Sequence, residues 1–485
     1  MLLKDLLYNV DVIQNEGDLA IEITDVQFDS RKVKSGSLFI AINGEKVDGH
    51  KYIRGAIRDG SIAVIVEHIH EDIIQNGVTY IKVEDSRHTL ALIAANFYNN
   101  PSKKICLIGV TGTNGKTTVV SLLYQLFVLL NVKVGILSTI HNKVDKQTIP
   151  ATHTTPDPLQ INYLLDKMVR SDCKYCFMEV SSHAVAQSRI EGLYFSAGIF
   201  SNISRDHLDY HNTFSEYISA KKKFFDLLPE ESFALTNLDD KQGLKMLENT
   251  RAHKLSYALQ SFADFHCRII ETRIDGMLLN IGKQDVWVNL IGKFNAYNLL
   301  SVYAIANKLG FADIEVLSAL SMLYSPEGRL QFVKSDNNIT GVVDYAHTDD
   351  ALKNILNTIN QIKTIKQDVI TVIGCGGDRD VTKRPLIASV ACKLSKHVIF
   401  TTDNPRSEDP ENIIDHMLEG VDEHEKNKVL VILDRKQAIK TSCSLARDND
   451  IVLISGKGHE KFQEFRDVKI PFDDFSELKE SLKVK

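Results

Sequence analysis

The spacing of apolar residues divides the chain into three successive series of strands and helices. Residues 1–100 contain apolar runs of strand length, such as SLFIAI, IAVIVE and VTYIKV, mixed with helical stretches, and end at the turn-rich segment FYNNPSKK. A strand over 104–110 begins the second series, in which ICLIGV, KVGILST, YCFMEV and SAGIFSNI alternate with helices such as 117–130. After SPEGRLQ the alternation restarts with GVVDYAH, DVITVIGCGG, HVIFTTDNP, KVLVILD and DIVLISGKG, with helices near 350–362 and 384–395.

This alternation predicts an α/β protein of three domains. We expect a small α/β domain over 1–100, a central domain with a mostly parallel sheet over 101–330, and a Rossmann-like domain over 331–485. A length of 485 residues agrees with this division, because one hydrophobic core rarely serves more than about 250–300 residues. Doubly wound sheets bind ligands in the loops after the carboxyl ends of their strands, so the candidate chemistry should lie in those loops.

Composition narrows the class of protein. A hydrophobic share of 44% with 25% charged residues is typical of a soluble globular protein, and the net charge of -6 offers no general basic surface for nucleic acid. The apolar runs have the length of strands rather than of membrane spans, and the first residues lack the basic region and cleavage site of a signal peptide. We therefore expect a cytoplasmic monomer that acts on small molecules, with neither a nucleic-acid nor a membrane partner.

Cysteine usage offers little candidate chemistry. Seven scattered cysteines indicate reduced thiols rather than a disulfide framework. Cys173 and Cys176 have CxxC spacing, but they lie in the apolar strand pattern CKYCFMEV without a second pair. Burial in a strand therefore explains them better than zinc or redox chemistry.

The segment GVTGTNGKTT, residues 109–118, has the pattern of a phosphate-binding loop between a strand and a helix. Its glycines let backbone N–H groups converge on phosphate oxygens, Lys116 can reach the β- and γ-phosphates, and the Thr117 hydroxyl can bind Mg²⁺. The spacing departs from GxxxxGKT, because Val110 stands six positions before Lys116. The pattern predicts ATP binding by Gly112, Thr113, Asn114, Gly115, Lys116, Thr117 and Thr118. Motors, switches, kinases and ligases all remain open at this point.

Acidic residues at two other strand ends could place a metal ion beside this loop. Glu179 ends the apolar strand YCFMEV, where a P-loop sheet carries the carboxylate that holds the metal. An ordinary surface acid at a strand end is the alternative interpretation. The segment SNISRDHLDYH puts Asp206, His207 and Asp209 in a loop at another strand end, shortly before Lys221.

Lys221 interrupts an apolar helix face. On a helix over 214–228, the residues around it form a buried stripe of Phe214, Tyr217, Ile218, Phe224, Phe225 and Leu228. The neighbouring Lys222 and Lys223 point elsewhere. A lysine in such a stripe most often extends its ammonium past apolar neighbours to water, so the pattern alone favours a structural lysine.

A series of motifs, in order from about residue 30 to residue 460, resembles the Mur ligase family, the ATP-dependent amino-acid ligases of peptidoglycan synthesis. The motifs are GTNGKTT, TTPDP, MEVSSHA, NISRDHLDYH, AKKKFF, GKFNAYN, EGRL, DYAH, GGDRD, TDNPRSEDP and GKGHE. The resemblance implies a domain that binds the UDP end of a UDP-N-acetylmuramoyl substrate, a central ATPase, and a Rossmann-like domain that closes over the site. It also implies transfer of the γ-phosphoryl group of ATP to a substrate carboxylate, giving an acyl phosphate that an amine attacks.

The resemblance changes the interpretation of Lys221. In this family the lysine that closes the YxxAK pattern is carbamylated by CO₂ and binds a second Mg²⁺, here with His207, while Thr117 and Glu179 hold the first. Partial burial suits this chemistry, because it lowers the pKa of a lysine and leaves a neutral amine to attack CO₂. The catalytic residues implied by the resemblance are Lys116, His207, Lys221, Arg329 and His347.

The resemblance also implies further nucleotide contacts. Asn295, Asn298 and Asp344 would contact ATP, and Arg329 and His347 would approach it when the C-terminal domain closes. One departure from the family pattern is Asp349 in DYAHTDD, where a proline is usual. This departure concerns the rigidity of the loop more than its chemistry.

Two groups of residues resemble the substrate contacts of the family member that adds the third residue of the peptide. The implied contacts to the UDP-muramoyl peptide are Ser30, His50, Thr154, Thr155, Ser181, Gln187 and Arg189. The implied contacts to meso-diaminopimelate are Arg379, Asp403, Asn404, Arg406, Gly456 and Glu460. Arg406 of DNPR can clamp a carboxylate with two hydrogen bonds, which would distinguish diaminopimelate from lysine. The alternative is a turn at a helix start, in which Arg406 only pairs with Glu408 or Asp409.

The expected function is ATP-dependent addition of meso-diaminopimelate to UDP-N-acetylmuramoyl-L-alanyl-D-glutamate, with two Mg²⁺ ions and a carbamate on Lys221. Within the family, a lysine-adding ligase and a folylpolyglutamate-type ligase are the alternatives; Arg406 argues against the first, and the uridine-binding segment against the second. From another class, the chain could be a binding protein that uses its P-loop as a nucleotide switch. The metal motifs and the amino-acid site favour turnover over such a switch.

Overall fold

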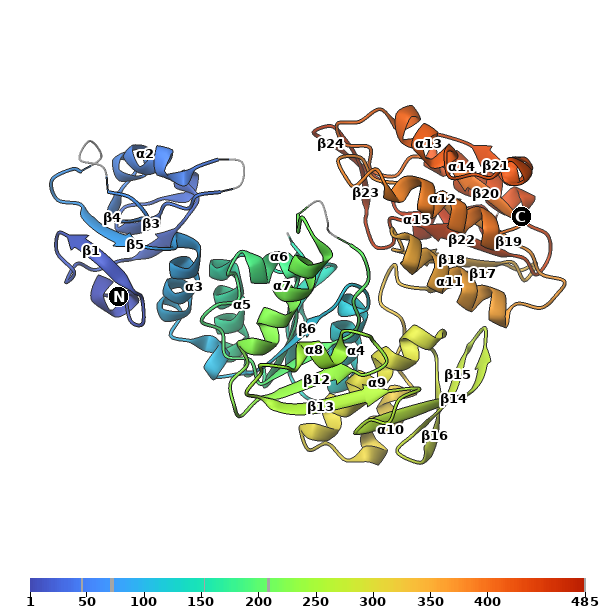
Figure 1. Ribbon diagram of the computed structural model, residues 1–485, viewed down its shortest axis with the longest axis horizontal. Helices are drawn as coiled ribbons and strands as arrows, with labels where there is room; N and C mark the ends of the chain where they lie inside the picture. The colour runs from blue at the N-terminus through green and yellow to red at the C-terminus, as the bar shows by residue number, and fades with distance from the viewer. Residues whose placement is uncertain (45–46, 70–73, 152, 207–209, 484–485) are drawn as a thin grey trace.

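The computed structural model describes residues 1–485 except 45–46, 70–73, 152, 207–209 and 484–485. Three α/β lobes follow one another along the chain, each built around its own sheet (Figure 1). The predicted fold class, α/β with three domains, is therefore confirmed. Among the described residues, none of the helices combines the length and the apolar character needed to cross a lipid bilayer.

The N-terminal lobe is a five-stranded sheet with helices packed around it. In spatial order the strands are β1 (Val12–Glu16), β5 (Thr79–Val83), β4 (Ser61–Val66), β3 (Ser37–Ile40) and β2 (Asp25–Gln27), and only β1 is antiparallel to its neighbour. The helices are α1 (Leu3–Leu6), α2 (Ile53–Arg58) and α3 (Ser86–Phe97). Asp85 caps α3 by accepting from the backbone N–H groups of Arg87 and His88, and α3 leads toward the central lobe (Figure 1).

The central lobe contains an eleven-stranded sheet. In spatial order its strands are β16 (Gln284–Val288), β15 (Gly276–Ile281), β14 (Phe265–Arg273), β13 (His253–Ala258), β12 (Phe233–Asn237), β11 (Ala197–Phe200), β6 (Cys106–Thr111), β10 (Tyr175–Glu179), β7 (Val134–Leu137), β8 (His141–Val144) and β9 (Gln147–Pro150). The helices are α4 (Lys116–Leu129), α5 (Pro158–Arg170), α6 (Ser182–Ala186), α7 (Phe214–Asp226), α8 (Gly243–Met246), α9 (Lys293–Lys308) and α10 (Asp313–Leu320). The strands from β14 to β7 run parallel, and antiparallel strands close both edges.

The order of the middle strands brings three loops together. Strand β6 lies between β11 and β10, and all three are almost completely buried because helices cover the sheet on both sides. The P-loop follows β6, Glu179 ends β10, and residues 201–206 follow β11. Parallel neighbours end at the same edge of a sheet, so these loops adjoin one another.

Helix α7 carries the predicted apolar stripe with one correction. Four residues of the stripe lie in one hydrophobic core of the central lobe: Ile218, Phe224, Phe225 and Leu228. Tyr217 is buried as well. Phe214 was expected in this stripe but is 37% exposed, because it is the first residue of the helix and lies at its end, outside that core. Lys221 is buried in the middle of the stripe.

The C-terminal lobe has a six-stranded sheet of Rossmann type. In spatial order its strands are β17 (Gln331–Lys334), β18 (Thr340–Asp344), β22 (Ile451–Ser455), β19 (Val369–Ile373), β20 (His397–Phe400) and β21 (Val429–Val431), with β17 antiparallel and the rest parallel. Its helices are α11 (Asp349–Ile362), α12 (Lys383–Leu394), α13 (Pro410–Leu418), α14 (Arg435–Leu445) and α15 (Asp474–Lys483). A hairpin of β23 (Phe462–Phe465) and β24 (Val468–Pro471) stands beside the sheet.

The unusual Asp349 lies at the first position of α11. Thr348 caps this helix by accepting from the Ala351 backbone N–H, and Asp349 and Asp350 are acidic residues in its first turn. A proline at this position would preset the helical backbone, whereas an aspartate favours the same start through the helix dipole. The substitution therefore keeps the beginning of α11.

Candidate functional site

The phosphate-binding loop and helix α7 meet at one carbonyl oxygen. Lys116 Nζ donates to the carbonyl oxygens of Gly112 and Thr113, each at 2.9 Å, and Lys221 Nζ donates to the same Gly112 oxygen at 2.8 Å. Lys221 is 1% exposed, and its Nζ lies 4.5 Å from the centre of the Tyr217 ring. Burial, with Lys116 as a second cause, lowers the pKa of Lys221 well below its usual range. Lys221 is buried, so the interpretation in which its ammonium extends past apolar neighbours to water is wrong.

Glu179 is the centre of a buried group of oxygen atoms. Its Oε2 accepts from the hydroxyls of Thr117 (3.0 Å) and Thr139 (3.2 Å), and its Oε1 accepts from the Thr139 backbone N–H (2.8 Å). The carboxylate is fully buried, which raises its pKa, while Lys116 acts in the opposite direction. Glu179 is therefore not the ordinary surface acid that was the alternative.

A cavity of about 550 Å³ lies between the P-loop and the C-terminal lobe. Several residues that were predicted to contact or approach the nucleotide line this cavity: Asn114, Gly115, Thr118, Asn295, Asn298, Arg329, Asp344 and His347. Asn298 lies against the loop, because a Cβ atom added to Gly115, whose φ is +90°, would be 2.7 Å from Asn298 Oδ1. Gly112, Thr113, Lys116 and Thr117 do not line this cavity.

The Arg329 guanidinium stacks on the Tyr345 ring where the chain passes from the central to the C-terminal lobe. The Arg329 guanidinium lies 4.6 Å from the centre of the Tyr345 ring, and its Nη2 donates to Thr117 Oγ1 at 3.3 Å. Burial raises the pKa of Tyr345 to about 12. Arg329 therefore contacts the P-loop threonine and the C-terminal lobe at the same time.

Asp344 ends β18 and holds the link between the two lobes. Its Oδ2 accepts from the Leu330 backbone N–H and its Oδ1 from the Ala346 backbone N–H, both at 2.7 Å. Both carboxylate oxygens are thus engaged by the chain itself. His347, two residues further on, is exposed, and its Nδ1 lies 2.9 Å from the Tyr345 carbonyl oxygen.

A second cavity, of about 780 Å³, joins the N-terminal and central lobes. Ser30, Arg31 and Arg87 line it on one side, and Gln187 and Arg189 on the other. His50 does not belong to its wall. His50 Nδ1 lies 2.7 Å from Asp48 Oδ1 and its Nε2 accepts from the Glu67 backbone N–H, so both ring nitrogens have partners within the N-terminal lobe.

The other predicted substrate contacts connect this cavity with Glu179. The Thr155 hydroxyl donates to the Glu179 carbonyl oxygen at 2.7 Å and accepts from the Ser181 backbone N–H. Arg189 donates to the Thr155 carbonyl oxygen at 2.7 Å and to Gln187 Oε1 at 2.6 Å. The Thr154 hydroxyl oxygen lies 3.2 Å from the hydroxyl oxygen of Thr139, which donates to Glu179. The chain thus forms a continuous polar path from the cavity to the buried carboxylate.

The predicted diaminopimelate contacts come together at the ends of β19, β20 and β22. Gly376 lies between Arg379, Asn404 and Arg406, since a Cβ atom there would be 3.1 Å from Arg406 Nη1 and within 3.9 Å of the other two. Asn404 Nδ2 donates to Glu460 Oε2 at 2.7 Å. A Cβ atom on Gly456, whose φ is +113°, would be 2.6 Å from Asp403 Oδ2.

Arg406 pairs with neither Glu408 nor Asp409. Its Nη1 donates to the Gly377 carbonyl oxygen at 2.6 Å, and its Nε lies 3.3 Å from Glu464 Oε2. Glu408 is bound instead by the guanidinium of Arg384. The predicted alternative, a pairing of Arg406 with Glu408 or Asp409, is therefore wrong.

Sequence reasoning missed three residues that the fold brings to these sites. Tyr345 lines the nucleotide cavity and also lies near the predicted diaminopimelate contacts. Lys457 contacts Asn404 and Glu460, and Lys383 contacts Asp206. Tyr345 belongs to the DYAH motif and Lys457 to GKGHE, whereas Lys383 follows GGDRD by three positions, so proximity to the motif residues was the available signal. The expected metal ligand His207 and its neighbour Asp209 lie outside the described residues. Cys173 and Cys176 are buried free thiols, as predicted.

This fold and site define a three-domain α/β protein with a phosphate-binding loop that faces a Rossmann-like domain. Family models for the Mur ligase family catalytic domain, the Mur ligase middle domain and the Mur ligase glutamate ligase domain match residues 22–98, 110–306 and 328–458. The chain belongs to the Mur ligase family.

Full-length relatives carry one name. The chain is 51% identical to UDP-N-acetylmuramoyl-L-alanyl-D-glutamate--2,6-diaminopimelate ligase of Cytophaga hutchinsonii over 482 residues, with 99% of each chain covered, and 41% identical to the ligase of that name from Clostridioides difficile, with 98% of each covered. A solved structure of a ligase of the same name is 30% identical, with a TM-score of 0.70, and covers 99% of this chain and 98% of that chain. A folylpolyglutamate synthase of Mycobacterium tuberculosis, 17% identical with a TM-score of 0.61 over 76% of this chain and 91% of that chain, shares the fold.

Proposed function

We propose that this chain catalyses the ATP-dependent addition of meso-diaminopimelate to UDP-N-acetylmuramoyl-L-alanyl-D-glutamate, a step in the synthesis of peptidoglycan precursors. The observation that carries the proposal is the identity of about half of all positions with ligases of that name over almost the entire length of both chains. The convergence of Arg406 and Asn404 at Gly376, with Glu460 hydrogen-bonded to Asn404, supports the choice of amino acid.

The two cavities suit the two larger substrates. The cavity between the N-terminal and central lobes would take the UDP end near Ser30 and the muramoyl peptide near Gln187 and Arg189. The cavity at Asn114, Gly115 and Asn298 would take ATP, with its phosphates at the P-loop. The polar path through Thr155 would lead the peptide carboxylate toward the γ-phosphate.

The residues at the P-loop fit a magnesium ion. Thr117 and Glu179 offer a hydroxyl and a carboxylate 3.0 Å apart at the start of α4, and hard oxygen ligands of this kind suit Mg²⁺. When bound, Mg²⁺ would offset the negative charge of the phosphoryl group and of the carboxylate that approaches it. Lys116 would neutralise the same phosphates, and Arg329 and His347 would approach them from the C-terminal side.

Lys221 fits a carbamate. Its amine is buried beside Gly112 and Lys116, and its lowered pKa favours the neutral form. The neutral nitrogen would form a bond to the carbon of CO₂ with its lone pair, while one C=O double bond of CO₂ becomes a single C–O⁻ bond and the nitrogen releases one proton to water. The resulting anionic carbamate could hold a second Mg²⁺ with His207. Placement next to the P-loop would put that anion where positive metal charge is needed.

The geometry also suits attack by the incoming amino acid. The predicted diaminopimelate contacts lie on the C-terminal lobe. Tyr345 lies near them, lines the nucleotide cavity and packs against Arg329. When the C-terminal lobe closes, the amine would approach the acyl phosphate while water is excluded from it. We further propose domain limits of 1–100, 101–330 and 331–485 and action as a cytoplasmic monomer.

The mass of the product tests the proposal. The protein is incubated with UDP-N-acetylmuramoyl-L-alanyl-D-glutamate, ATP, Mg²⁺ and an equimolar mixture of meso-diaminopimelate and lysine. We expect a product that carries diaminopimelate, with ADP and phosphate released in equal amount. A lysine-containing product would identify a lysine-adding ligase instead. ATP hydrolysis without any amide product would identify a nucleotide-gated binding protein.

A further inference from the structure

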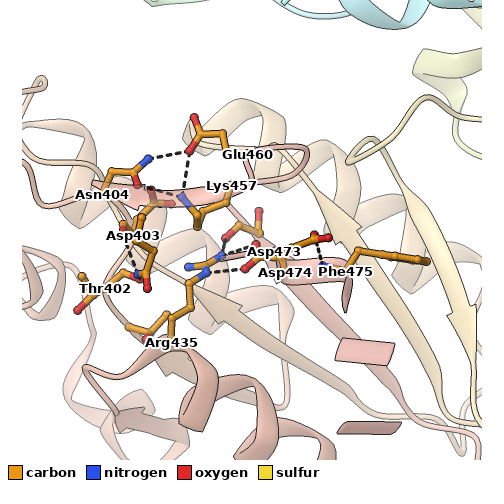
Figure 2. A network of polar contacts seen from close by, with 12 residues as sticks. Thr402, Asp403, Asn404, Arg435, Lys457, Glu460, Asp473, Asp474 and Phe475 are labelled. Carbon is orange, nitrogen blue, oxygen red and sulfur yellow. Dashed lines mark hydrogen bonds and ion pairs between the residues drawn. The ribbon is translucent and has the colours of Figure 1, made fainter. Parts of the chain in front are cut away.

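Lys457 is a fully buried lysine between Asn404 and Glu460, two of the predicted diaminopimelate contacts. It follows β22 in the loop SGKGHE and has 0% exposure. Its Nζ lies 3.0 Å from Asn404 Oδ1 and 3.1 Å from Glu460 Oε2. Figure 2 shows its ammonium between these two side chains, which come from different loops.

Lys457 determines how the Asn404 amide is oriented. Asn404 Oδ1 accepts from Lys457 Nζ and from the Glu464 backbone N–H (3.0 Å), while its Nδ2 donates to Glu460 Oε2. A rotated amide would place its NH₂ group against the ammonium and the backbone N–H, so only one orientation satisfies all partners. Without the ammonium, this preference would be weaker.

Lys457 also binds one of the two oxygens of Glu460. The other oxygen, Oε1, makes no hydrogen bond within the described part of the chain, and the Glu460 side chain keeps 21% exposure. A carboxylate held at one oxygen presents the second oxygen in a defined direction. That second oxygen is available to an ammonium group of a ligand.

A second buried ion pair supports the base of this loop. Arg435, at the start of α14, donates to both carboxylate oxygens of Asp474 at 2.7 Å, and both side chains have 0% exposure. Arg435 also donates to the Ser455 carbonyl oxygen at 3.0 Å, which holds the end of β22 just before Lys457. The backbone below Lys457 is therefore anchored independently of Lys457 itself.

The contacts of Lys457 favour a role in the site over a role in folding. Burying an ammonium costs free energy, and apolar residues of similar size usually serve a core as well or better. Arg435 and Asp474 already anchor the loop, and Lys457 directs its hydrogen bonds to Asn404 and Glu460, two residues of the candidate amino-acid site. The cation therefore orients groups that face a ligand.

We propose that Lys457 is a positioning residue for the incoming amino acid. It holds the Asn404 amide and one oxygen of Glu460, so that the second oxygen of Glu460 meets the distal ammonium group of the amino acid. This inference rests on the proposed function, because it assigns Asn404 and Glu460 to the diaminopimelate site. Lys457 acts through these two residues and does not itself touch the substrate.

Steady-state kinetics of Lys457→Met test the inference. Methionine keeps most of the length and removes the charge, so KM for diaminopimelate should rise about 30-fold or more, while KM for ATP and for the UDP-muramoyl peptide should change by less than about twofold. Lys469→Met is the matched control, because Lys469 and Lys457 both lie near the Phe462 ring but Lys469 is exposed on β24. The control should keep all three KM values.

A double mutant separates positioning from direct contact. If Lys457 acts through Glu460, then Lys457→Met should weaken amino-acid use much less in a Glu460→Gln background than in the wild type. Lys457→Gln, which can still donate to Asn404 Oδ1, should recover part of the loss and serves as the second variant if Lys457→Met folds poorly. Thermal unfolding with bound ATP analogue checks the fold of each variant.

Two results would overturn the inference. One is an unchanged KM for diaminopimelate in Lys457→Met and Lys457→Gln. The other is a parallel loss for all three substrates together with a lowered melting temperature, which would make Lys457 a structural residue. Failure of the proposed function is recognised separately, because the wild-type protein would then form no diaminopimelate product in the same assay.

Discussion

Lys383 Nζ lies 2.6 Å from Asp206 Oδ1, although 177 positions separate the two residues along the chain. Lys383 begins α12 in the C-terminal lobe, and Asp206 lies in the loop after β11 in the central lobe. Both side chains are largely buried, with exposures of 18% and 8%. This ion pair joins the two lobes directly beside the P-loop.

The same loop contacts the P-loop on its other side. The Ser204 backbone N–H donates to Thr113 Oγ1 at 3.0 Å, and the Ser204 carbonyl oxygen accepts from the same hydroxyl. Ser204 lines the same cavity as Asp350, at the start of α11. The loop of residues 201–206 therefore lies between the P-loop and two helices of the C-terminal lobe.

We expect Lys383→Met to weaken the contact between the central and C-terminal lobes. Loss of one partner from a partly buried ion pair should cost about 1 to 3 kcal/mol, between the values for surface and for buried pairs. The value of kcat should fall about tenfold or more, and small-angle scattering with an ATP analogue should show a more open particle. Lys393→Met, an exposed position on the same helix, is the control. Equal kcat and equal scattering for both variants would contradict this prediction.

Replacement of Lys221 by alanine should remove most activity. The carbamate proposed at this position would be lost, and short carboxylic acids should restore part of the rate by supplying a similar anion. Lys223→Ala is the matched control, since Lys223 lies on the same helix but pairs with Glu191 at the surface. Product formation is measured with and without added acid. If Lys221→Ala were fully active, or if Lys223→Ala lost as much, the assignment would be wrong.

Arg406→Ala should change the choice of amino acid. A bidentate, charge-assisted pair with the distal carboxylate would contribute about 2 to 5 kcal/mol, so efficiency with diaminopimelate should fall about 10²- to 10³-fold or more. Weak use of lysine should stay level or rise, because lysine lacks that carboxylate. Arg466→Ala, at the exposed turn of the adjacent hairpin, is the control. Equal losses with diaminopimelate and lysine would show that Arg406 only holds its loop.

The stability of the C-terminal lobe should decrease in mild acid because of His459. Burial, with Arg329 and Lys461 nearby, lowers the pKa of His459 from 6.5 to about 3. Between these values the unfolded chain binds more protons than the folded one, so stability is lost as pH falls through this window. From pH 7 to pH 5 the loss from this residue should be about 2 kcal/mol.

Urea unfolding at pH 7 and pH 5 checks this prediction. His459→Gln should show a smaller difference between the two pH values than the wild-type protein. His266→Gln, at an exposed position on β14, is the control and should behave as the wild type. An identical pH dependence in His459→Gln would show that His459 does not titrate in this way.

Local patterns of the sequence were sufficient for the fold class and for most elements. The alternation of apolar runs with amphipathic helices predicted α/β domains. The residues that a strand or a helix buries follow a characteristic spacing along the chain, and this spacing does not depend on where the element lies in the fold. The predicted helices near 117–130, 350–362 and 384–395 correspond to α4, α11 and α12 within one residue at each end. The phosphate-binding loop was recognisable for the same reason, since strand, glycines, lysine and helix are consecutive.

Only the tertiary structure decided which residues share a site. Strand β6 lies between β11 and β10, neither of which follows it directly in the chain, and this order brings Glu179 and Asp206 to the P-loop. Helix packing decided that Lys221 is enclosed while Phe214 is exposed, although both belong to one apolar stripe. Lys457 obtained Asn404, and Lys383 obtained Asp206, from distant loops, because hydrogen bonds and ion pairs depend on distance in space rather than on spacing along the chain.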